Sequence, residues 1–429
     1  MQDQLLAGAV EIDITPPVGG GFDGYAARTG ASLGVHDPLL AQLLLLKAGD
    51  QQVVLITMDL LGVGLDFTRR VRAGIEQAIG APPERVIIAC SHTHSGAAGF
   101  LPPHPGIPTV PDPELQRTVE RQLVGAAIWA GRRLQPARLG AGKGMVKGIG
   151  LNRNDPQQEV DDEVHGLRID GEDGQPMAVV MNYGCHPTVL GYQNLYYSAD
   201  YPGAARSALC KIYPGTVFMF TNGASGDISA RFTRREQSFN EVERMGRLLA
   251  GEMLKVMQNI LTGAPAELDG RVAPVELKFR PFPAPAQAQH ELEQLQVDLE
   301  ALKAAGAAHG EIRRATTRVE GAMGQALMAK ELAGRTSNRS QVQILQIGDL
   351  ALVGLPGEAF THTVLEIKKS SQFPFTAVVS YANDYQGYFP DSVSIAMGSY
   401  EALISPYGAD VAEGLHQAAI QAMHKGLHV

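Results

Sequence analysis

The feature that most constrains the fold is an alternation of strand and helix signals in the first hundred residues. Leu39–Lys47 and Gln52–Asp59 are largely apolar and are separated by a turn at Ala48–Asp50, which is typical of paired strands. Asp66–Ile79 then has apolar residues at helical spacing, and Arg85–Cys90 (RVIIAC) has the continuous apolar character of a buried strand. This order of elements predicts a sheet covered by helices.

The rest of the chain extends this pattern and predicts an α/β fold with mixed β-sheets flanked by helices. Further strands are predicted at Pro176–Tyr183, Gly215–Thr221, Gln341–Gly354 and Phe375–Tyr381, and further helices at Leu115–Arg132, Asn240–Leu261 and Val411–Gly426. Phe100–Pro113 is rich in Pro and Gly, which predicts a surface loop.

Residues 285–334 differ from this pattern in composition, because Ala, Gln, Glu, Leu and Arg predominate there. Two helices are predicted, about Gln287–Ala305 and Glu311–Leu332, with a break at Gly306–Gly310. We interpret them as a helical insertion, or arm, within a single domain that spans residues 1–429.

Charge and hydropathy exclude two classes of partner. The formal net charge is −9 over 429 residues, so the chain has no overall positive field that would attract a nucleic acid. The apolar runs, such as Gln52–Leu61, are too short to cross a bilayer, and we expect no transmembrane segment.

The cysteines and the N-terminus bear on localisation. Cys90, Cys185 and Cys210 are too few and too scattered for a disulfide framework, and the first residues have no basic or continuously apolar region of a secretory signal. We therefore expect reduced thiols and a cytoplasmic protein. The sequence leaves open whether the chain forms a homo-oligomer.

Histidines follow the RVIIAC strand in the segment Ser91–Gly96, SHTHSG. On an extended backbone, side chains two residues apart point to the same face, so His92 and His94 can share one site. Neutral imidazoles are good zinc ligands. The alternative, about as common for an isolated His-x-His pair, is two structural histidines that bind backbone groups.

Two other strands also end in residues that can bind a metal. His186 follows the strand AVVMNY, and Glu358 follows LALVG and a Pro-Gly turn. Three protein ligands and one open position are what a catalytic zinc requires. Cys185 is a core thiol in this interpretation, because neighbouring side chains on an extended segment face opposite ways.

An ordered set of short motifs resembles the neutral (alkaline, non-lysosomal) ceramidase family. The motifs are AVEIDITPP at residues 9–17, SHTHSG at 91–96, NRN at 152–154, HPT at 186–188, GDIS at 226–229, PGE at 356–358, the Asn-x-Tyr-x-x-Tyr spacing at 383–388, and Tyr-Glu at 400–401. The resemblance runs from about Ala9 to Glu401. It implies the α/β fold and a hydrolase that cleaves an amide bond.

The resemblance also implies a bound Zn²⁺ and its ligands. The family's zinc ligands fall on His92, His186, Glu358 and Tyr388 of this sequence. Tyrosine is an uncommon zinc ligand, so Tyr388 is the least expected member of the set.

Five other residues occupy positions that act on the substrate in the family. His94 corresponds to the acid/base residue, and Arg153 and Tyr400 correspond to the residues that hold the developing oxyanion. Ser229, with Asp227 in the same GDxS motif, corresponds to residues at the substrate. The resemblance therefore implies attack by zinc-activated water on the amide, with His94 carrying the proton.

The sequence departs from the family in two places. The motif GDxSPN reads GDISAR at Gly226–Arg231, and only about 30 residues follow Tyr400, where typical members have an immunoglobulin-like domain. We therefore expect a soluble or modest-sized N-acyl amide as substrate, rather than ceramide in a bilayer.

Two other functions stay open at this point. A metal-independent serine amidase would use Ser229 as nucleophile, but no general base lies near Ser229 in the sequence. A non-catalytic metal-binding protein would use the helical arm for assembly, but such a protein would have no need of His94, Arg153 and Tyr400.

Overall fold

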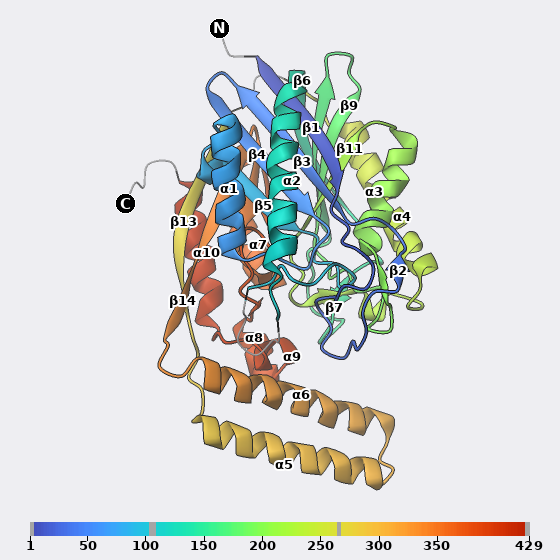
Figure 1. Ribbon diagram of the computed structural model, residues 1–429, viewed down its shortest axis with the longest axis vertical. Coiled ribbons are helices and arrows are strands. Elements are labelled where there is room, and N and C mark those ends of the chain that lie inside the picture. The colour runs from blue at the N-terminus through green and yellow to red at the C-terminus, as the bar shows by residue number, and fades with distance from the viewer. Residues whose placement is uncertain (1–3, 103–108, 264–266, 425–429) are drawn as a thin grey trace.

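Two β-sheets packed face to face form the centre of the protein, with helices on the outer side of each sheet (Figure 1). The computed structural model describes residues 4–102, 109–263 and 267–424. Within these residues, the larger sheet has eight strands in the order β11-β9-β8-β6-β1-β3-β4-β5. The strands are β1 (Leu5–Asp13), β3 (Leu40–Ala48), β4 (Gln51–Met58), β5 (Val86–Cys90), β6 (Gln135–Met145), β8 (Glu163–Gly171), β9 (Pro176–Tyr183) and β11 (Val217–Asn222).

The smaller sheet has four strands in the order β13-β14-β15-β17. The strands are β13 (Leu268–Lys278), β14 (Ser337–Ile347), β15 (Leu350–Gly354) and β17 (Phe375–Val379). Both sheets are mixed, because β4–β5, β9–β11 and β15–β17 pair in parallel and their other neighbours pair antiparallel.

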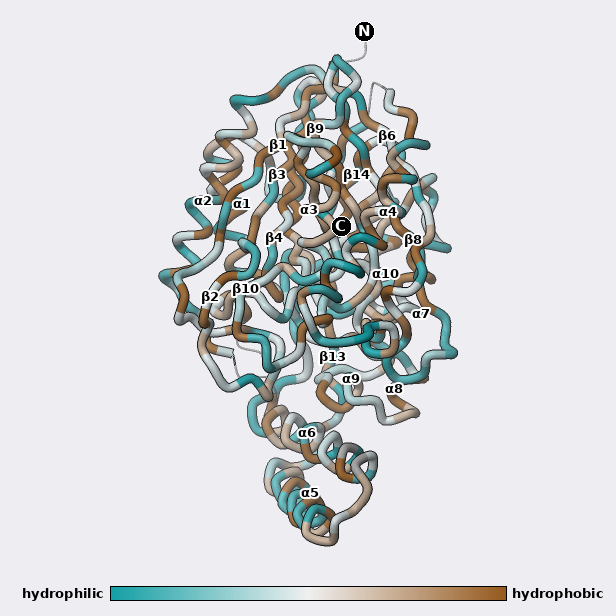
Figure 2. Tube along the Cα trace, turned by 90° about the vertical axis from the view of Figure 1, so that its right-hand side faces the viewer, coloured by the Kyte–Doolittle hydropathy of each residue, from teal (hydrophilic) through white to brown (hydrophobic). Residues whose placement is uncertain are grey.

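Successive side chains of a strand point to opposite faces of its sheet, so each central strand contributes to two hydrophobic cores. In β4, Val53 and Leu55 belong to the core between the two sheets, whereas Val54 and Ile56 belong to the core under the helices. Each fully buried aliphatic side chain of this kind contributes roughly 1.5–3 kcal/mol to folding. In Figure 2, hydrophobic residues lie along the interior strands β3, β9 and β14.

Helices cover both outer faces. The larger sheet packs against α1 (Leu65–Ile79), α2 (Pro113–Arg132), α3 (Asp200–Ile212) and α4 (Phe239–Asn259), and the smaller sheet against α7 (Thr361–Lys369) and α10 (Asp410–Met423). Gly80 ends α1 in the left-handed conformation, with φ of 72° and its N–H bonded to Glu76 O, as expected of a C-cap glycine.

The predicted α/β fold with mixed sheets and a helical insertion is confirmed. The strand signal over Gln341–Gly354 divides into β14 and β15, because Gly348 turns the chain with φ of 58°. Parts of two predicted elements, residues 103–108 of the loop and 425–426 of the last helix, lie outside the described residues.

The helical insertion is a hairpin of α5 (Pro285–Ala304) and α6 (His309–Glu331), which extends from the end of the body (Figure 1). The two helices pack on each other through a small core of their own, formed by Leu292, Leu299, Val319 and Ala322. Short helices α8 (Ser392–Met397) and α9 (Tyr400–Leu403) lie between α6 and the body.

Three short strand pairs lie at the end of the sheets that is nearer the hairpin. They are β2 (Gly34–Val35) with β10 (Tyr196–Tyr197), β7 (Leu151–Asn152) with β12 (Ile228–Ser229), and β16 (Glu358–Ala359) with β18 (Tyr388–Phe389). They fix loops that follow the long strands, and these loops hold the polar residues described below.

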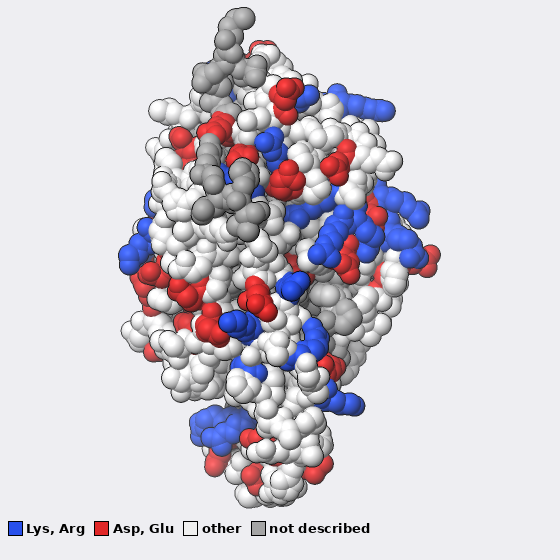
Figure 3. Space-filling view, turned by 90° about the vertical axis from the view of Figure 1, so that its left-hand side faces the viewer, with Lys and Arg blue, Asp and Glu red and all other residues white. Residues whose placement is uncertain are grey.

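The surface carries charges of both signs. On the face in Figure 3, basic and acidic side chains are interspersed and neither sign covers the face alone. None of the helices in the described part of the chain is both long and apolar enough to span a membrane.

Candidate functional site

The chain segments that follow β5, β9 and β15 bring His92, His186 and Glu358 together in the interior. All three side chains are buried, with at most 2% of each exposed. His186 Nε2 lies 3.1 Å from Glu358 Oε2, and His92 Nε2 lies 3.6 Å from the same oxygen. The residues predicted at the three strand ends therefore meet at one point.

His94 joins this point as well. Its Nε2 lies 3.4 Å from His92 Nε2, and ligand atoms of His92, His94 and His186 all lie within 4.8 Å of one another. Among the described residues, these three histidines form the group whose ligand atoms lie close enough together to hold one metal ion.

His92 and His94 lie together as predicted, but the extended backbone from which this was predicted is wrong. His92 has φ of 67° and so is left-handed rather than extended, a conformation that costs a non-glycine residue about 1 kcal/mol or more. The imidazole of His92 stacks on Tyr381 with 3.8 Å between centroids and 6° between planes. A bond from Nδ1 to Leu61 O, of 2.8 Å, holds the ring further.

Hydrogen bonds orient two of the imidazoles with Nε2 inward. His92 uses Nδ1 to bond Leu61 O, and His186 uses Nδ1 to bond Ser225 O. An imidazole that donates from Nδ1 carries its lone pair on Nε2, which is the usual arrangement of a histidine that binds a metal. Within the described residues, His186 Nε2 has no hydrogen-bond partner, although Glu358 lies so close.

Burial keeps the histidines uncharged. Burial lowers the pKa of His92 and of His186 to about 3 and lowers the pKa of His94 well below 6.5. The lone pairs of two neutral rings therefore face the carboxyl group of Glu358 in a buried site. A cation between them would satisfy all these atoms, so the residues fit a metal ion.

Tyrosines surround the carboxylate of Glu358. Tyr385 donates from its hydroxyl to Oε1 at 2.6 Å, and the hydroxyl of Tyr381 lies 3.5 Å from Oε2. Tyr388 is the direct register partner of Glu358 in the parallel β16–β18 pair, so the two side chains leave the pair on the same face. The ring of Tyr388 lies 6.4 Å from that of His186.

Arg153 lies beside Tyr388 and is paired with a buried acid. Its guanidinium carbon is 5.2 Å from the centroid of Tyr388, and Nε is 2.7 Å from Glu401 Oε1. Asn154 Nδ2 also donates to Glu401, at 3.0 Å. Burial alone would raise the pKa of Glu401, but Arg153 and these bonds hold it below its ordinary value, so the pair is ionised.

Tyr400 begins α9 and packs on the cluster of Phe360, Tyr388 and Ile404. Burial, followed by the nearby charge of Glu320, raises the pKa of Tyr400 to about 12. Its hydroxyl therefore keeps its proton near neutral pH and can donate a hydrogen bond.

Asp227 and Ser229 lie on the segment that pairs with the backbone at His186. Asp227 Oδ1 accepts from the backbone N of Thr361 at 2.9 Å, and Oδ2 accepts from Asn152 at 3.1 Å. The hydroxyl of Ser229 accepts from Arg231 N at 3.3 Å, and its backbone pairs with that of His186. Burial raises the pKa of Asp227 to about 6.

Several supporting residues had no site role in the sequence analysis: Ser225, Tyr381, Tyr385 and Glu401. Tyr385 and Glu401 fall inside motifs that were recognised, and Tyr381 precedes the first of these motifs by two residues. The clustering of tyrosines between positions 381 and 388 could have pointed to two of them. The carbonyl of Ser225 has no signal in the sequence.

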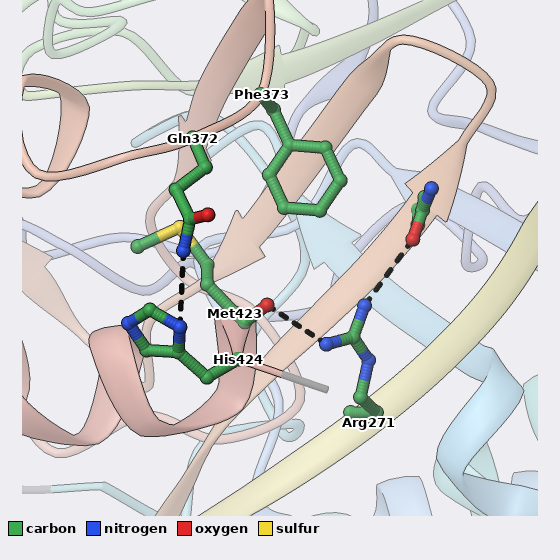
Figure 4. Close-up of a pocket in the computed structure, with 6 residues that line it drawn as sticks. Arg271, Gln372, Phe373, Met423 and His424 are labelled. Atoms are coloured by element: carbon green, nitrogen blue, oxygen red, sulfur yellow. Dashed lines mark hydrogen bonds between the residues drawn. The ribbon is translucent and has the colours of Figure 1, made fainter. Parts of the chain in front are cut away.

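A cavity of about 400 Å³ lies elsewhere, between β13, β14 and the end of α10 (Figure 4). None of the predicted site residues lines it. Its polar groups bond one another, since Arg271 donates to Met423 O at 2.9 Å and Gln372 bonds His424 at 3.0 Å. The histidine centre, where His186 Nε2 has no hydrogen-bond partner among the described residues, is the better candidate.

Comparison with solved structures supports the fold. The crystal structure of neutral ceramidase from Pseudomonas aeruginosa aligns with a TM-score of 0.77 and 19% identity, covering 98% of this chain and 74% of that one. A structure described as ceramidase complexed with C2 aligns with a TM-score of 0.75 and 17% identity, covering 98% of this chain and 75% of that one. At such identities the likeness concerns the fold alone.

The sequence comparison bears on the family. The family model described as neutral/alkaline non-lysosomal ceramidase, N-terminal, matches residues 5–234, which is more than half of the chain and includes His92, His94 and His186. This chain belongs to the neutral/alkaline non-lysosomal ceramidase family.

Proposed function

We propose that this protein is a zinc-dependent hydrolase that cleaves the amide bond of an N-acyl substrate. The observation that carries the proposal is that His92 Nε2 and His186 Nε2 both lie within 3.6 Å of one Glu358 oxygen in a buried site. In the described part of the chain, no hydrogen bond reaches His186 Nε2. Membership of the ceramidase family supports an amide-bond hydrolase.

The metal would be held by His92, His186 and Glu358, with Tyr388 as fourth ligand. Neutral imidazoles and a carboxylate are the donors that zinc takes in catalytic sites. When bound, zinc supplies Lewis-acid chemistry, which polarises a carbonyl and brings the pKa of water near 7. Tyr385 and Tyr381 orient the carboxylate, and the carbonyls of Leu61 and Ser225 orient the imidazoles.

His94 is the proposed proton carrier. Its ring is uncharged near neutral pH, so Nε2 can accept a proton from the attacking water and return it to the leaving amine. Arg28 donates to the carbonyl of His94 at 2.5 Å, and the ring of Tyr25 meets the imidazole edge-on at 4.7 Å. These contacts hold the imidazole against the metal ligands.

Arg153 and Tyr400 are the proposed donors to the oxyanion that forms when water attacks the amide carbonyl. Arg153 is held by Glu401 and lies over Tyr388, and Tyr400 packs on the same cluster. Loss of one such donor typically costs about 3–4 kcal/mol of the barrier. We propose that Asp227 and Ser229 position the loop at the substrate, because their hydrogen bonds go to neighbouring backbone and side chains.

The proposed substrate is an N-acyl amide of modest size, with ceramide as the larger alternative. A protein with net charge −9 has no electrostatic attraction to an anionic lipid surface. Turnover of short, water-soluble N-acyl amides and of long-chain ceramide in mixed micelles can be compared directly. A strong preference for the micellar ceramide would contradict the expected order.

The test of the function combines metal analysis with activity. The purified protein should contain zinc, hydrolyse an N-acyl amide, lose activity on dialysis against dipicolinate, and regain it with added Zn²⁺. Ser229→Ala should keep most of the activity. Activity that survives chelation but disappears in Ser229→Ala would favour the serine amidase, and bound metal without any hydrolysis would favour the binding protein.

A further inference from the structure

The helical hairpin contacts the segment that carries Tyr400 and Glu401. Two buried glycines on α6, Gly321 and Gly324, face α9. A Cβ at Gly321 would lie 2.9 Å from Leu403 Cδ1 and 3.2 Å from Leu403 Cβ, and a Cβ at Gly324 would lie 3.3 Å from Ile404 Cγ2. The close approach of α6 and α9 therefore depends on the absence of these side chains.

Glycine inside a helix needs a reason, because it costs about 1 kcal/mol relative to alanine. Gly321 and Gly324 are three residues apart and so lie on one face of α6. Elsewhere on the same helix, a Cβ at Gly310 would meet, among the described side chains, only Arg314 Nη1, at 3.8 Å. Contact with α9 gives the two buried glycines a role that Gly310 lacks.

Arg280, which precedes α5, holds the same segment from the base of the hairpin. Its Nε donates to Ser405 O at 3.0 Å, its Nη2 donates to Leu403 O at 3.0 Å, and its backbone N donates to Pro406 O at 2.9 Å. These carbonyls lie at the end of α9 and just after it, where helix carbonyls have no partner within the helix. One residue therefore fixes three points of this segment, at Leu403, Ser405 and Pro406.

The segment in turn fixes residues of the proposed site. Glu401 binds Arg153 at 2.7 Å. The hydroxyl of Ser405 donates to the backbone carbonyl of Tyr388 at 2.8 Å. Tyr400 lies at the start of α9 and packs against Tyr388.

We propose that the α5–α6 hairpin and Arg280 are positioning elements for the active site, which set the place of Tyr400 and of the Glu401–Arg153 pair relative to the histidine centre. The proposal rests on the proposed function for its effect on turnover. The physical link is short: α6 packs on α9 through the two glycines, Arg280 binds the end of α9, and α9 carries the two side chains.

The test is a wedge between α6 and α9. In the double variant G321A/G324A, the two added methyl groups push α9 away from α6, and we expect kcat for an N-acyl amide to fall at least 10-fold with KM changed less than 2-fold. Bound metal should stay at the wild-type level. The control Gly310→Ala, which adds the same methyl group on the same helix, should have wild-type kcat.

A double-mutant cycle separates positioning from general damage. If the wedge acts by moving Tyr400, it should lower kcat much less in a Tyr400→Phe background than in the wild type, because residues that act together are not additive. An equal loss in both backgrounds, or an unchanged kcat in G321A/G324A, would overturn the proposal.

Variants of Arg280 test the proposal independently. Arg280→Met should lower kcat at least 10-fold, and Arg280→Lys, which keeps a charged donor, should recover part of the loss. Arg335→Met is the control, because Arg335 also lies at the base of the hairpin, over the ring of Phe279, but bonds Asn338 rather than the end of α9.

Hydrogen exchange tests the structural step without any substrate. In G321A/G324A and in Arg280→Met, the amides of residues 399–407 should exchange at least 10-fold faster while those of β4 and β9 stay at the wild-type rate. Unchanged exchange at 399–407 overturns the positioning role even if the protein hydrolyses amides. Faster exchange there in a protein without amidase activity would leave the packing role standing and remove the proposed function.

Discussion

His186 Nε2 lies 3.1 Å from Glu358 Oε2 in a buried site, and no hydrogen bond joins the two atoms. Two buried acceptor atoms that face each other are costly, because neither can donate a proton to the other and both need a shared donor or cation. A metal ion is the simplest common partner, and this relationship supports the proposed zinc site more directly than any sequence motif.

We predict one equivalent of zinc per chain and its loss in His186→Ala. Removing one of the ligands opens the site, and the remaining lone pairs no longer surround the ion. Metal content is measured on purified protein by elemental analysis. The control is His165→Gln, which changes a buried histidine of β8 whose Nε2 bonds Glu163 at 3.1 Å. Undiminished zinc in His186→Ala would contradict the assignment.

Removal of the metal should also lower stability. A ligand that binds only the folded state raises the unfolding free energy by RT ln(1 + [L]/Kd), which is about 4 kcal/mol at 1,000 times Kd. Thermal unfolding of the protein should therefore shift to lower temperature after dialysis against dipicolinate and return with Zn²⁺. His186→Ala should unfold at the same temperature with and without the chelator.

The two histidines of SHTHSG should separate in their effects. His92→Ala should lose metal and activity together, because Nε2 of His92 faces Glu358. His94→Ala should keep zinc while turnover falls about 100- to 10,000-fold, the usual contribution of a positioned acid/base. Since the Nε2 atoms of both residues lie 3.4 Å apart, position alone does not separate the roles. Loss of metal from His94→Ala would make it a ligand and place the base elsewhere.

The sequence was sufficient to predict much of the fold where hydrophobic pattern and secondary structure agree. The strand Pro176–Tyr183 was predicted with the bounds of β9, since its apolar run has clear ends. The strand β6 was missed, because Gly140, Gly142 and Gly144 remove the strand signal. Added Cβ atoms there would clash with Ile260 of the chain after α4 and with Glu252 of α4, so tertiary packing rather than propensity explains these glycines.

The candidate site was predictable where ligands follow strands, and less so where support comes from distant segments. His92, His186 and Glu358 each follow a recognisable apolar strand. The hydrogen bonds from Tyr385 to Glu358 and from His186 to the carbonyl of Ser225 depend on how separate loops meet. No local pattern encodes such contacts, so they emerge only from the folded chain.

Asp200 should make stability depend on pH between about 4 and 6. Burial raises the pKa of its carboxyl from 3.8 to about 6, although Leu190 N and Tyr201 N donate to it at 3.1 and 2.7 Å. A raised carboxyl pKa means that folding favours the protonated form. The stability that this carboxyl contributes is therefore complete below about pH 4 and is lost as the pH rises to about 6. Above that pH the unfolding free energy no longer changes because of Asp200.

Asp200→Asn should remove this pH dependence of the unfolding free energy, whatever the substitution does to the stability itself. The wild type should lose up to about 3 kcal/mol of unfolding free energy relative to the variant between pH 4 and 7, from 1.36 kcal/mol per pKa unit. Urea unfolding of both proteins at several pH values measures the difference, in which other titrating groups cancel. Parallel curves for the two proteins would show that Asp200 does not titrate in this range.

Gly24 offers a test of the position of His94 that leaves the imidazole itself unchanged. A Cβ at Gly24 would lie 2.5 Å from His94 Nδ1 and 2.6 Å from Cγ, so Gly24→Ala must displace the ring. The backbone of Gly24 is also left-handed, with φ of 102°, which alanine adopts at a cost of about 1–2 kcal/mol. Strain and displacement must therefore be separated.

Gly19→Ala separates them, because Gly19 has φ of 98° and no atom within 4 Å of its added Cβ. Both variants should lose a similar 1–2 kcal/mol of unfolding free energy from the backbone, and both should keep the bound metal. Only Gly24→Ala should lose turnover, by about 10-fold or more, since a small displacement of a catalytic group is already costly. Equal activity of the two variants, measured on the same N-acyl amide at saturating zinc, would mean that the place of the His94 ring against Gly24 does not matter for the reaction.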